Sequence, residues 1–238
     1  MTYWKRPDGF PYPQVWRRFQ VRDPLTGELE AYRVQDLPPE RFEDAIDHMC
    51  NHFLRDEPIC ASLNLVGDTV GIEELSAVWR RVVEQRCAVV CFKEASDEII
   101  GLNMLTVVSK EDSHKEPLKF KSAAVQTFVD CTLYLTEKGN LFERHHIDHF
   151  LSAWGLSVHP NFRRRGLATE ILSARDPICR AFGLSLSATV FSHPGSQIPA
   201  AKVGFQEEVV EKFADLANVG FRIPTKVEYN KLMTLKIS

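Results

Sequence analysis

The residues best suited to do chemistry lie in one continuous run, Leu156-Ser157-Val158-His159-Pro160-Asn161-Phe162-Arg163-Arg164-Arg165-Gly166-Leu167-Ala168-Thr169. A strand is predicted to end at Val158 and a helix to begin at Gly166, with a basic loop between them. A helix start offers unpaired main-chain N–H groups and the positive end of the helix dipole. Gly166 and Ala168 leave room for a phosphate to approach this main chain. The run therefore predicts an anion site, and a solvated basic loop is the alternative for its arginines.

Other polar residues carry a weaker signal. Ser192 and Ser196 flank Pro194-Gly195, where turn residues and a helix N-cap are the simplest interpretation. Three histidines have no carboxylate or cysteine partner at a metal-binding spacing, so we expect surface or core roles and no metal: His145, His146 and His149. The six cysteines show no CxxC spacing, which favours reduced structural thiols over a disulfide or zinc framework.

Alternating strands and helices must position these residues. The hydrophobic pattern predicts strands at 29–36, 88–93, 99–108, 151–158, 184–190, 205–212 and 229–237. It predicts helices at 39–55, 70–86, 121–138, 141–145, 166–182 and 197–203. Pro177 falls inside the helix that follows the basic loop and should kink or shorten it. This order indicates an α/β fold with a mixed sheet in one domain, residues 29–238, on which an aromatic-rich extension, residues 1–28, packs.

Composition excludes several classes of protein. The chain has 238 residues, 44% of them hydrophobic and 26% charged, which is unlike a disordered, collagen-like or coiled-coil protein. No apolar run reaches the ~20 residues of a membrane helix, and the N-terminus has no apolar signal region, so we expect a cytoplasmic protein. A net charge of −3 gives no overall attraction to nucleic acid or to an anionic membrane, and we expect neither as a partner.

The basic loop is similar to the phosphate-binding pattern [Q/R]xxGx[G/A] of the GNAT acyl-CoA transferases, with Arg163, Gly166 and Ala168 in the three defined positions. Within that superfamily, residues 30–236 resemble the insect-type arylalkylamine N-acetyltransferases. Two further blocks carry the resemblance. One is His52-Phe53-Leu54-Arg55-Asp56-Glu57-Pro58, and the other is Ser192-His193-Pro194-Gly195-Ser196, which precedes Gly204-Phe205.

The resemblance implies a GNAT fold, with a mixed and mostly antiparallel sheet that is splayed at the acyl-CoA site and flanked by helices. It implies that the CoA diphosphate binds the main-chain N–H groups of the loop and that the pantetheine arm pairs with the preceding strand end. The implied cofactor-binding residues are Leu156, Ser157, Val158, Arg163, Arg164, Arg165, Gly166, Leu167, Ala168 and Thr169. Glu57 resembles the general base, although a Glu-Pro pair alone favours a helix cap. Ser192 and Ser196 resemble hydroxyls that relay protons and contact the thioester sulfur.

The expected activity is acetyl-CoA-dependent N-acetylation of a primary arylalkylamine such as dopamine, serotonin, tyramine or tryptamine, by direct transfer in a ternary complex. The alternatives are an acetyltransferase for polyamine or agmatine-like amines, a transferase of longer acyl chains, and a non-catalytic acyl-CoA-binding relative. A polycation needs several carboxylates in its pocket, whereas an aryl group needs an apolar slot. Four aromatic residues lean toward an aryl slot: Phe120, Phe128, Tyr134 and Phe142.

Overall fold

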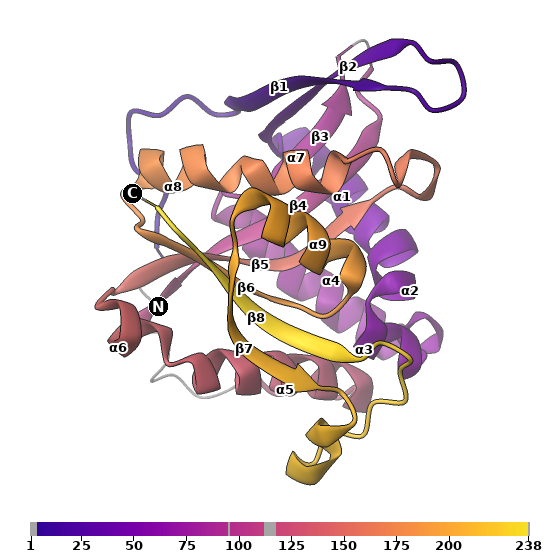
Figure 1. The fold of residues 1–238 in the computed structure, drawn as a ribbon, viewed down its shortest axis with the longest axis vertical. Coiled ribbons are helices and arrows are strands. Elements are labelled where there is room, and N and C mark those ends of the chain that lie inside the picture. Colours follow the sequence, from indigo (N-terminus) through magenta and orange to yellow (C-terminus); the bar gives the residue numbers. More distant parts are fainter. Residues whose placement is uncertain (1–3, 95, 112–117, 238) are drawn as a thin grey trace.

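One mixed sheet of eight strands organises the protein, in the order β1-β2-β3-β4-β5-β6-β8-β7 (Figure 1). The computed structural model describes residues 4–94, 96–111 and 118–237. Every neighbouring pair of strands is antiparallel except β5 and β6, which are parallel. The strands are β1 (Val15–Arg22), β2 (Leu29–Asp36), β3 (Val89–Lys93), β4 (Ile99–Ser109), β5 (His149–Val158), β6 (Leu186–Phe191), β7 (Gln206–Lys212) and β8 (Tyr229–Lys236).

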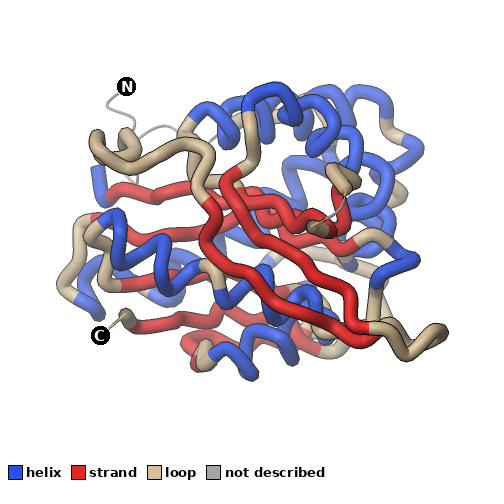
Figure 2. Tube along the Cα trace, turned by 90° about the horizontal axis from the view of Figure 1, so that it is seen from above, coloured by secondary structure: helices blue, strands red, loops and turns tan. Residues whose placement is uncertain are grey.

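Helices cover both faces of this sheet, which is seen in Figure 2 as a layer of strands between helices. The helices are α1 (Phe42–His48), a π-helical turn η2 (Met49–Phe53), α2 (Leu54–Asp56), α3 (Pro58–Ser62), α4 (Thr69–Glu84), α5 (Ala123–Gly139), α6 (Leu141–His145), α7 (Leu167–Ser173), α8 (Arg175–Phe182) and α9 (Pro194–Val203). Short 3-10 turns lie at Pro39–Arg41, Leu65–Gly67, Pro160–Phe162 and Asp215–Val219.

Two hydrophobic cores lie on opposite faces of the sheet. Successive side chains of a strand point to opposite faces, so on β4 Met104 joins the core that includes α1, α4 and α5, and the adjacent Leu105 joins the core that includes α7 and α8. A smaller cluster joins α9 to α7 and β6, where Leu172, Phe191 and Ala200 are buried together. The mixed, mostly antiparallel sheet flanked by helices that the sequence analysis predicted is therefore confirmed.

The predicted helix at 166–182 is divided into α7 and α8 at Ala174. Pro177 explains the division, because it has no N–H to donate to the carbonyl of Ser173 and its ring crowds that carbonyl. The prediction that Pro177 shortens or kinks this helix is confirmed. The remaining predicted strands and helices are present within a few residues, while α9 begins at Pro194 rather than at residue 197.

The N-terminal segment adds a strand that the sequence pattern did not reveal. β1 pairs with β2 at the edge of the sheet, inside the segment that we expected only to pack on the domain. Before it, the rings of Trp4 and Phe10 lie 5.4 and 6.0 Å from Phe182 at the end of α8. Arg6 forms a buried ion pair with Asp36 at 2.8 Å. These contacts fix the segment across one end of the sheet.

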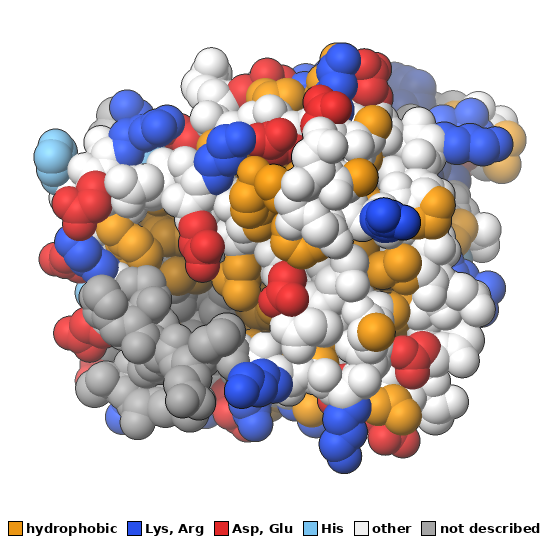
Figure 3. Space-filling view, turned by 90° about the horizontal axis from the view of Figure 1, so that it is seen from below, with side chains coloured by type: hydrophobic (Ala, Val, Ile, Leu, Met, Phe, Trp, Pro, Cys, Tyr) orange, Lys and Arg blue, Asp and Glu red, His pale blue; other side chains and the backbone are white. Residues whose placement is uncertain are grey.

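The surface seen from below mixes charges of both signs among apolar and polar side chains (Figure 3). Ion pairs on the surface of the molecule include Lys110 with Glu143 at 2.5 Å and Lys231 with Glu207 at 2.5 Å. In the described ranges of the chain, no helix combines the length and the apolar character needed to cross a membrane.

Candidate active site

A cavity of about 840 Å³ opens where β5 and β6 separate. These parallel strands pair at a single position, Leu151 with Ser187, and diverge toward their C-terminal ends. The cavity is lined by the loop before α7, by the two diverging strands and by residues on both faces of the sheet. Its walls include Phe53, Glu57, Asn103, Phe128, Trp154, Leu156, Ser157, Val158, Arg163, Arg164, Gly166, Leu167, Ala168, Thr169, Arg175, Thr189, Ser192 and Ser196.

A bulge in β5 bends this strand at the cavity. Asn103 pairs with Leu156 and Leu105 with Ala153, so β5 carries one extra residue opposite β4. Gly155 lies in the bulge with φ +130°, and a Cβ there would be 2.5 Å from the Met49 side chain. Only glycine fits both the backbone conformation and the close contact. Beyond the bulge, β5 is paired with β4 on one side, and its other side borders the cavity.

The loop before α7 forms an anion-binding turn. Arg164 and Gly166 both have left-handed backbone conformations, with φ of +61° and +81°. Within the described part of the chain, no acceptor bonds the main-chain N–H groups of residues 164–168. Concave sets of such N–H groups bind phosphate, and the N-terminus of a helix adds to their positive potential. A Cβ on Gly166 would meet nothing within 4 Å, so the turn is open to a ligand.

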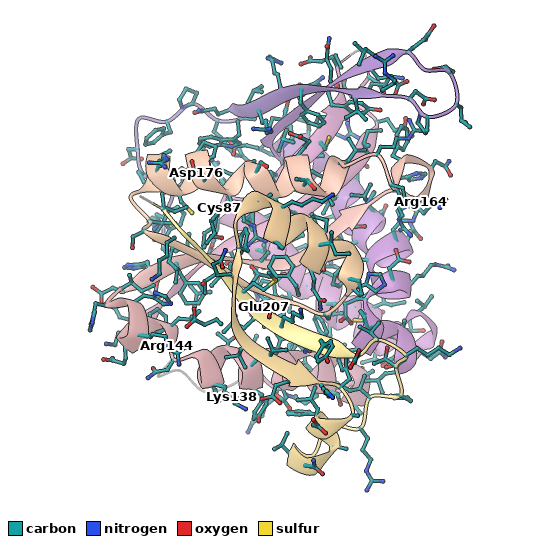
Figure 4. The ribbon with its side chains drawn as sticks, in the orientation of Figure 1. Cys87, Lys138, Arg144, Arg164, Asp176 and Glu207 are labelled. Atoms are coloured by element: carbon teal, nitrogen blue, oxygen red, sulfur yellow. The ribbon has the colours of Figure 1, made fainter. Side chains whose placement is uncertain are left out.

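The three arginines of this loop have different partners. Arg163 donates through Nε to the Val158 carbonyl at 2.9 Å and forms an ion pair with Asp56. Arg165 points to Asp23 at 2.6 Å, and its side chain does not line the cavity. Arg164 is exposed and lines the cavity. Figure 4 shows it in the loop before α7, well apart from Asp176 in the first turn of α8. Of the three, Arg164 is therefore the cation that can meet a bound phosphate.

Glu57 lies at the other end of the cavity as the N-cap of α3. Its side chain is only 6% exposed, and Oε2 accepts a hydrogen bond of 2.7 Å from the Cys60 N–H. Oε1 is buried and has no hydrogen-bond partner among the described residues. Burial raises the pKa of Glu57, and the Cys60 N–H and the Ser192 hydroxyl oppose this in part. Glu57 is thus both the cap of α3 and a carboxylate that lines the cavity, two roles that the sequence analysis treated as alternatives.

The two serines lie on either side of the start of α9, and both line the cavity. Ser192 follows β6 and is the serine that influences Glu57. The Ser196 hydroxyl donates to the His193 carbonyl at 2.9 Å. His193 is the N-cap of α9, since its Nδ1 accepts from the Gly195 N–H at 2.9 Å. The interpretation of a serine as this N-cap is therefore wrong, because the helix begins two residues before Ser196.

Around Glu57, the cavity wall is mostly apolar. The Phe53 and Phe128 rings lie edge to face at 6.3 Å, and Trp154 comes from the bulge in β5. The remaining apolar lining near them includes Val129, Leu133, Phe150 and Ile198. Among the described residues, Asp56 and Glu57 are the only carboxylates that line the cavity, and Asp56 is paired with Arg163.

No protein-family model matches the chain, and no curated protein matches it. Among solved structures, the protein designated arylalkylamine N-acetyltransferase 7 of the yellow fever mosquito Aedes aegypti shares 46% sequence identity, with a TM-score of 0.95. The alignment covers 99% of this chain and 100% of that one. The chain belongs to the insect arylalkylamine N-acetyltransferase family.

More distant structures share the fold of this family. Arylalkylamine N-acetyltransferase 2 of Aedes aegypti is 20% identical with a TM-score of 0.77, over 87% of this chain and 99% of that one. The Drosophila melanogaster polyamine N-acetyltransferase is 17% identical with a TM-score of 0.73, over 87% and 100%. At these identities the likeness concerns the fold alone.

Most of the aromatic residues that the sequence analysis offered for an aryl slot do not line the cavity. Of the four, only Phe128 lines the cavity. Phe142 packs on Phe150 at 5.3 Å, Tyr134 on Phe221 at 5.8 Å, and Phe120 lies against the larger core. These three candidates therefore do not line the cavity, because the sequence pattern of the segment 110–150 does not reveal which neighbouring element each ring meets.

The histidines singled out from the sequence lie away from the cavity. His145 is 3.3 Å from Glu208, and no group that could hold a metal exists in the described ranges. Three other histidines, His48, His52 and His159, lie close to the end of β5 at Ser157. His48 is buried against Ser157, with Nε2 and Oγ 3.1 Å apart. The His52 ring lies edge to face with both the His48 and the His159 rings. Burial lowers the pKa of His48 to about 3, so this ring is neutral.

The sequence analysis also missed the polar floor of the cavity, which consists of Asn103, Thr189 and Arg175. None belongs to a recognisable motif, and an arginine at position 175 looks like a solvated helix residue. The only signal was its spacing, four residues after Ile171 and three before Ile178, which places it on the apolar face of the predicted helix.

Proposed function

We propose that this protein transfers the acetyl group of acetyl-CoA directly to the primary amine of an arylalkylamine, with Glu57 as the general base. The observation that carries the proposal is one cavity with two ends. One end is a turn of unbonded N–H groups before α7, and the other is a buried carboxylate with a free oxygen in an apolar wall. Membership in the family agrees with this chemistry.

The cofactor end would hold acetyl-CoA through its phosphates and its pantetheine arm. The N–H groups of residues 164–168 and the Arg164 side chain suit the diphosphate. The amide groups of the arm can hydrogen-bond to the cavity side of β5 at residues 156–158, in the manner of an added strand. The thioester then lies between the diverging strands, where it can meet an amine that enters from the Glu57 side.

Glu57 is suited to remove a proton from the amine. An alkylamine is largely an ammonium ion at neutral pH, and its lone pair is blocked until a proton leaves. Burial raises the pKa of Glu57 and so makes this carboxylate a stronger base than an exposed one. The neutral nitrogen then attacks the thioester carbonyl, and the carbon–sulfur bond breaks with its electron pair on sulfur. Ser192 and Ser196 can donate a proton toward that sulfur.

The nature of the wall favours an aromatic acceptor. Phe53, Phe128 and Trp154 offer ring faces and edges to an aryl group. A polyamine or agmatine would need more than one carboxylate, yet Asp56 is engaged by Arg163. The Drosophila melanogaster structure with this fold is described as an enzyme that forms N-acetylagmatine, so an agmatine-like acceptor is the second candidate.

The decisive test measures CoA release from acetyl-CoA, with mass confirmation of the product, over a panel of dopamine, serotonin, tyramine, tryptamine, agmatine and spermidine. We expect turnover with the arylalkylamines and at least tenfold lower kcat/KM with the two polycations. The reverse order would assign the agmatine-like alternative. Binding of acetyl-CoA without product from any amine would indicate a non-catalytic relative. Localisation by microscopy is expected to be cytoplasmic, which suits the six free cysteines of the described chain.

A further inference from the structure

Arg175 is a fully buried cation at the floor of the cavity. It is the first residue of α8, and its side chain is 0% exposed although it lines the cavity. Nε donates to Asn103 Oδ1 at 3.0 Å, and Nη1 donates to Thr189 Oγ1 at 2.6 Å and to Ser187 Oγ at 3.3 Å. Nη2 is buried and has no acceptor among the described residues. Hydrogen bonds therefore hold Nε and Nη1 of the guanidinium in place, whereas Nη2 has none to the described residues.

No carboxylate neutralises this cation in the part of the chain that the structure describes. Its hydrogen-bond partners are an amide and two hydroxyls, and the Phe191 and Phe205 rings lie 5.9 and 5.6 Å from it. Burial lowers the pKa of Arg175 to about 9, and Cys179 is the only titratable neighbour that opposes this. A buried charge without a partner costs free energy, so a ligand that brings negative charge to Nη2 would be bound favourably.

The position of Arg175 indicates which atom of a ligand it meets. Ser187 takes part in the single pairing of β5 with β6, so Arg175 lies at the vertex of the opening between these strands. Asn103 connects Arg175 to the bulge, because its Nδ2 donates to the Gly155 carbonyl at 2.7 Å. An arm that enters at the turn before α7 and follows β5 from Val158 back to Leu156 is directed to this vertex. The reactive end of acetyl-CoA therefore comes closest to Arg175.

We propose that Arg175 stabilises the negative charge that forms on the sulfur of CoA when the thioester is cleaved. This inference rests on the proposed function. In the step concerned, the amine nitrogen forms a bond to the carbonyl carbon and the carbon–sulfur bond breaks. The ammonium proton goes to Glu57 before the attack, and the electron pair of the broken bond stays on sulfur as a thiolate. The nitrogen then loses its second proton, which ends on the thiolate, so that the products are the neutral amide and CoA thiol. A fixed cation at the vertex lowers the energy of the thiolate without any rearrangement of the site.

The test is the pKa of the CoA thiol in its complex with the protein, which does not require turnover. Thiolate absorbs near 240 nm, so the complex is titrated with pH, and the complex with desulfo-CoA serves as the blank. Burial raises the pKa of all six protein thiols, and the blank subtracts the absorbance change that the protein itself contributes. An opposite charge close by shifts a pKa by about one to three pH units. We expect the thiol pKa of bound CoA to be lower than that of free CoA by about this amount.

Three variants separate the charge from the fold. In Arg175→Met the shift should vanish, and kcat should fall about 100-fold with a smaller change in the KM for acetyl-CoA. In Thr189→Val, which removes the closer of the two acceptors of Nη1 and keeps the arginine, the shift should be reduced. Arg180→Met is the matched control on the same helix, because Arg180 is half-exposed and paired with Asp176, and it should keep the full shift.

The outcomes distinguish this inference from the proposed function. If calorimetry shows that CoA binds the unmodified protein but its thiol pKa equals that of free CoA, the role of Arg175 is overturned and the acetyltransferase remains. This result decides the matter even if Arg175→Met fails to fold. The same shift in folded Arg175→Met as in the unmodified protein would also overturn it. No binding of CoA at all would overturn both.

Discussion

At one end of the cavity, the turn at residues 164–168 presents main-chain N–H groups, and side chains matter there mainly by being small. At the other end, Glu57, Phe53, Phe128 and Trp154 present side chains that come from separate elements. The first end suits a ligand part that never changes, the phosphate and amide groups of CoA. The second end suits a ligand part that can differ between family members, the amine.

The difference also separates binding from chemistry. Substitutions at the turn should act on the dissociation constant of acetyl-CoA, whereas substitutions around Glu57 should act on turnover and its pH dependence. Four predictions test whether binding and turnover are divided in this way between the two ends of the cavity.

The largest effect is expected for Glu57→Gln. Loss of the base should lower kcat at pH 7 by about 10²- to 10⁴-fold and leave the affinity for acetyl-CoA nearly unchanged. In the unmodified protein, kcat/KM should fall as pH drops through the raised pKa of Glu57, because only the carboxylate accepts a proton. In the variant, the rate should recover as pH rises toward the pKa of the amine. Steady-state kinetics from pH 5 to 10 measure both profiles, with Glu40→Gln, an exposed glutamate, as the control.

Gly166→Val should weaken acetyl-CoA binding by about tenfold. The left-handed conformation at φ +81° costs a β-branched residue on the order of 1–2 kcal/mol, and relaxation of the turn moves its N–H groups. Gly183→Val is a matched control. Gly183 also has a positive φ, of +67°, and open space for a Cβ, but it lies at the far end of α8. Calorimetry should give equal affinity for Gly183→Val and the unmodified protein, and equal losses in both variants would argue against a phosphate-binding turn.

The two serines should differ. Ser192→Ala removes a hydroxyl that lowers the pKa of Glu57, so the acid limb of the pH profile should move to higher pH and kcat should fall about fivefold. Ser196→Ala removes a hydroxyl that donates to the His193 carbonyl, and we expect less than a twofold change. If Ser196→Ala lowered kcat more than Ser192→Ala, Ser196 would be the main donor of a proton to the CoA sulfur.

The smallest effects on affinity are expected in the arginine loop. Arg164→Met should raise the dissociation constant of acetyl-CoA about threefold at low salt and less at high salt, because its exposed charge is screened. Arg165→Met should instead lower the melting temperature, because it removes the cation paired with Asp23 and one of the two cations beside Glu30, the other being Lys93. Calorimetry at two salt concentrations and thermal melts separate the two arginines. A loss of affinity for acetyl-CoA in Arg165→Met alone would contradict the structure, in which Arg164 lines the cavity and Arg165 points to Asp23.

Local sequence determined the cofactor end almost completely. Gly166, Ala168 and the basic residues before them act through backbone conformation and helix geometry, which depend on neighbours in the chain. Likewise, Pro177 by itself ends α7 early, since its effect is on the preceding turn. The family resemblance rested on such local blocks, and the comparison with the Aedes aegypti structure confirmed it.

The tertiary structure decided everything that depends on residues distant in the chain. Phe128 faces the cavity whereas Phe142 packs on Phe150, although both are aromatic residues on neighbouring helices. Arg175 is a buried cation only because β4 and β6 bring Asn103 and Thr189 to it. Periodicity gives the face of a helix, but the element that covers this face is fixed by the packing of the whole chain. For this reason the sequence alone predicted the turn that we propose for acetyl-CoA, and only the fold revealed which side chains surround the proposed site of acetyl transfer.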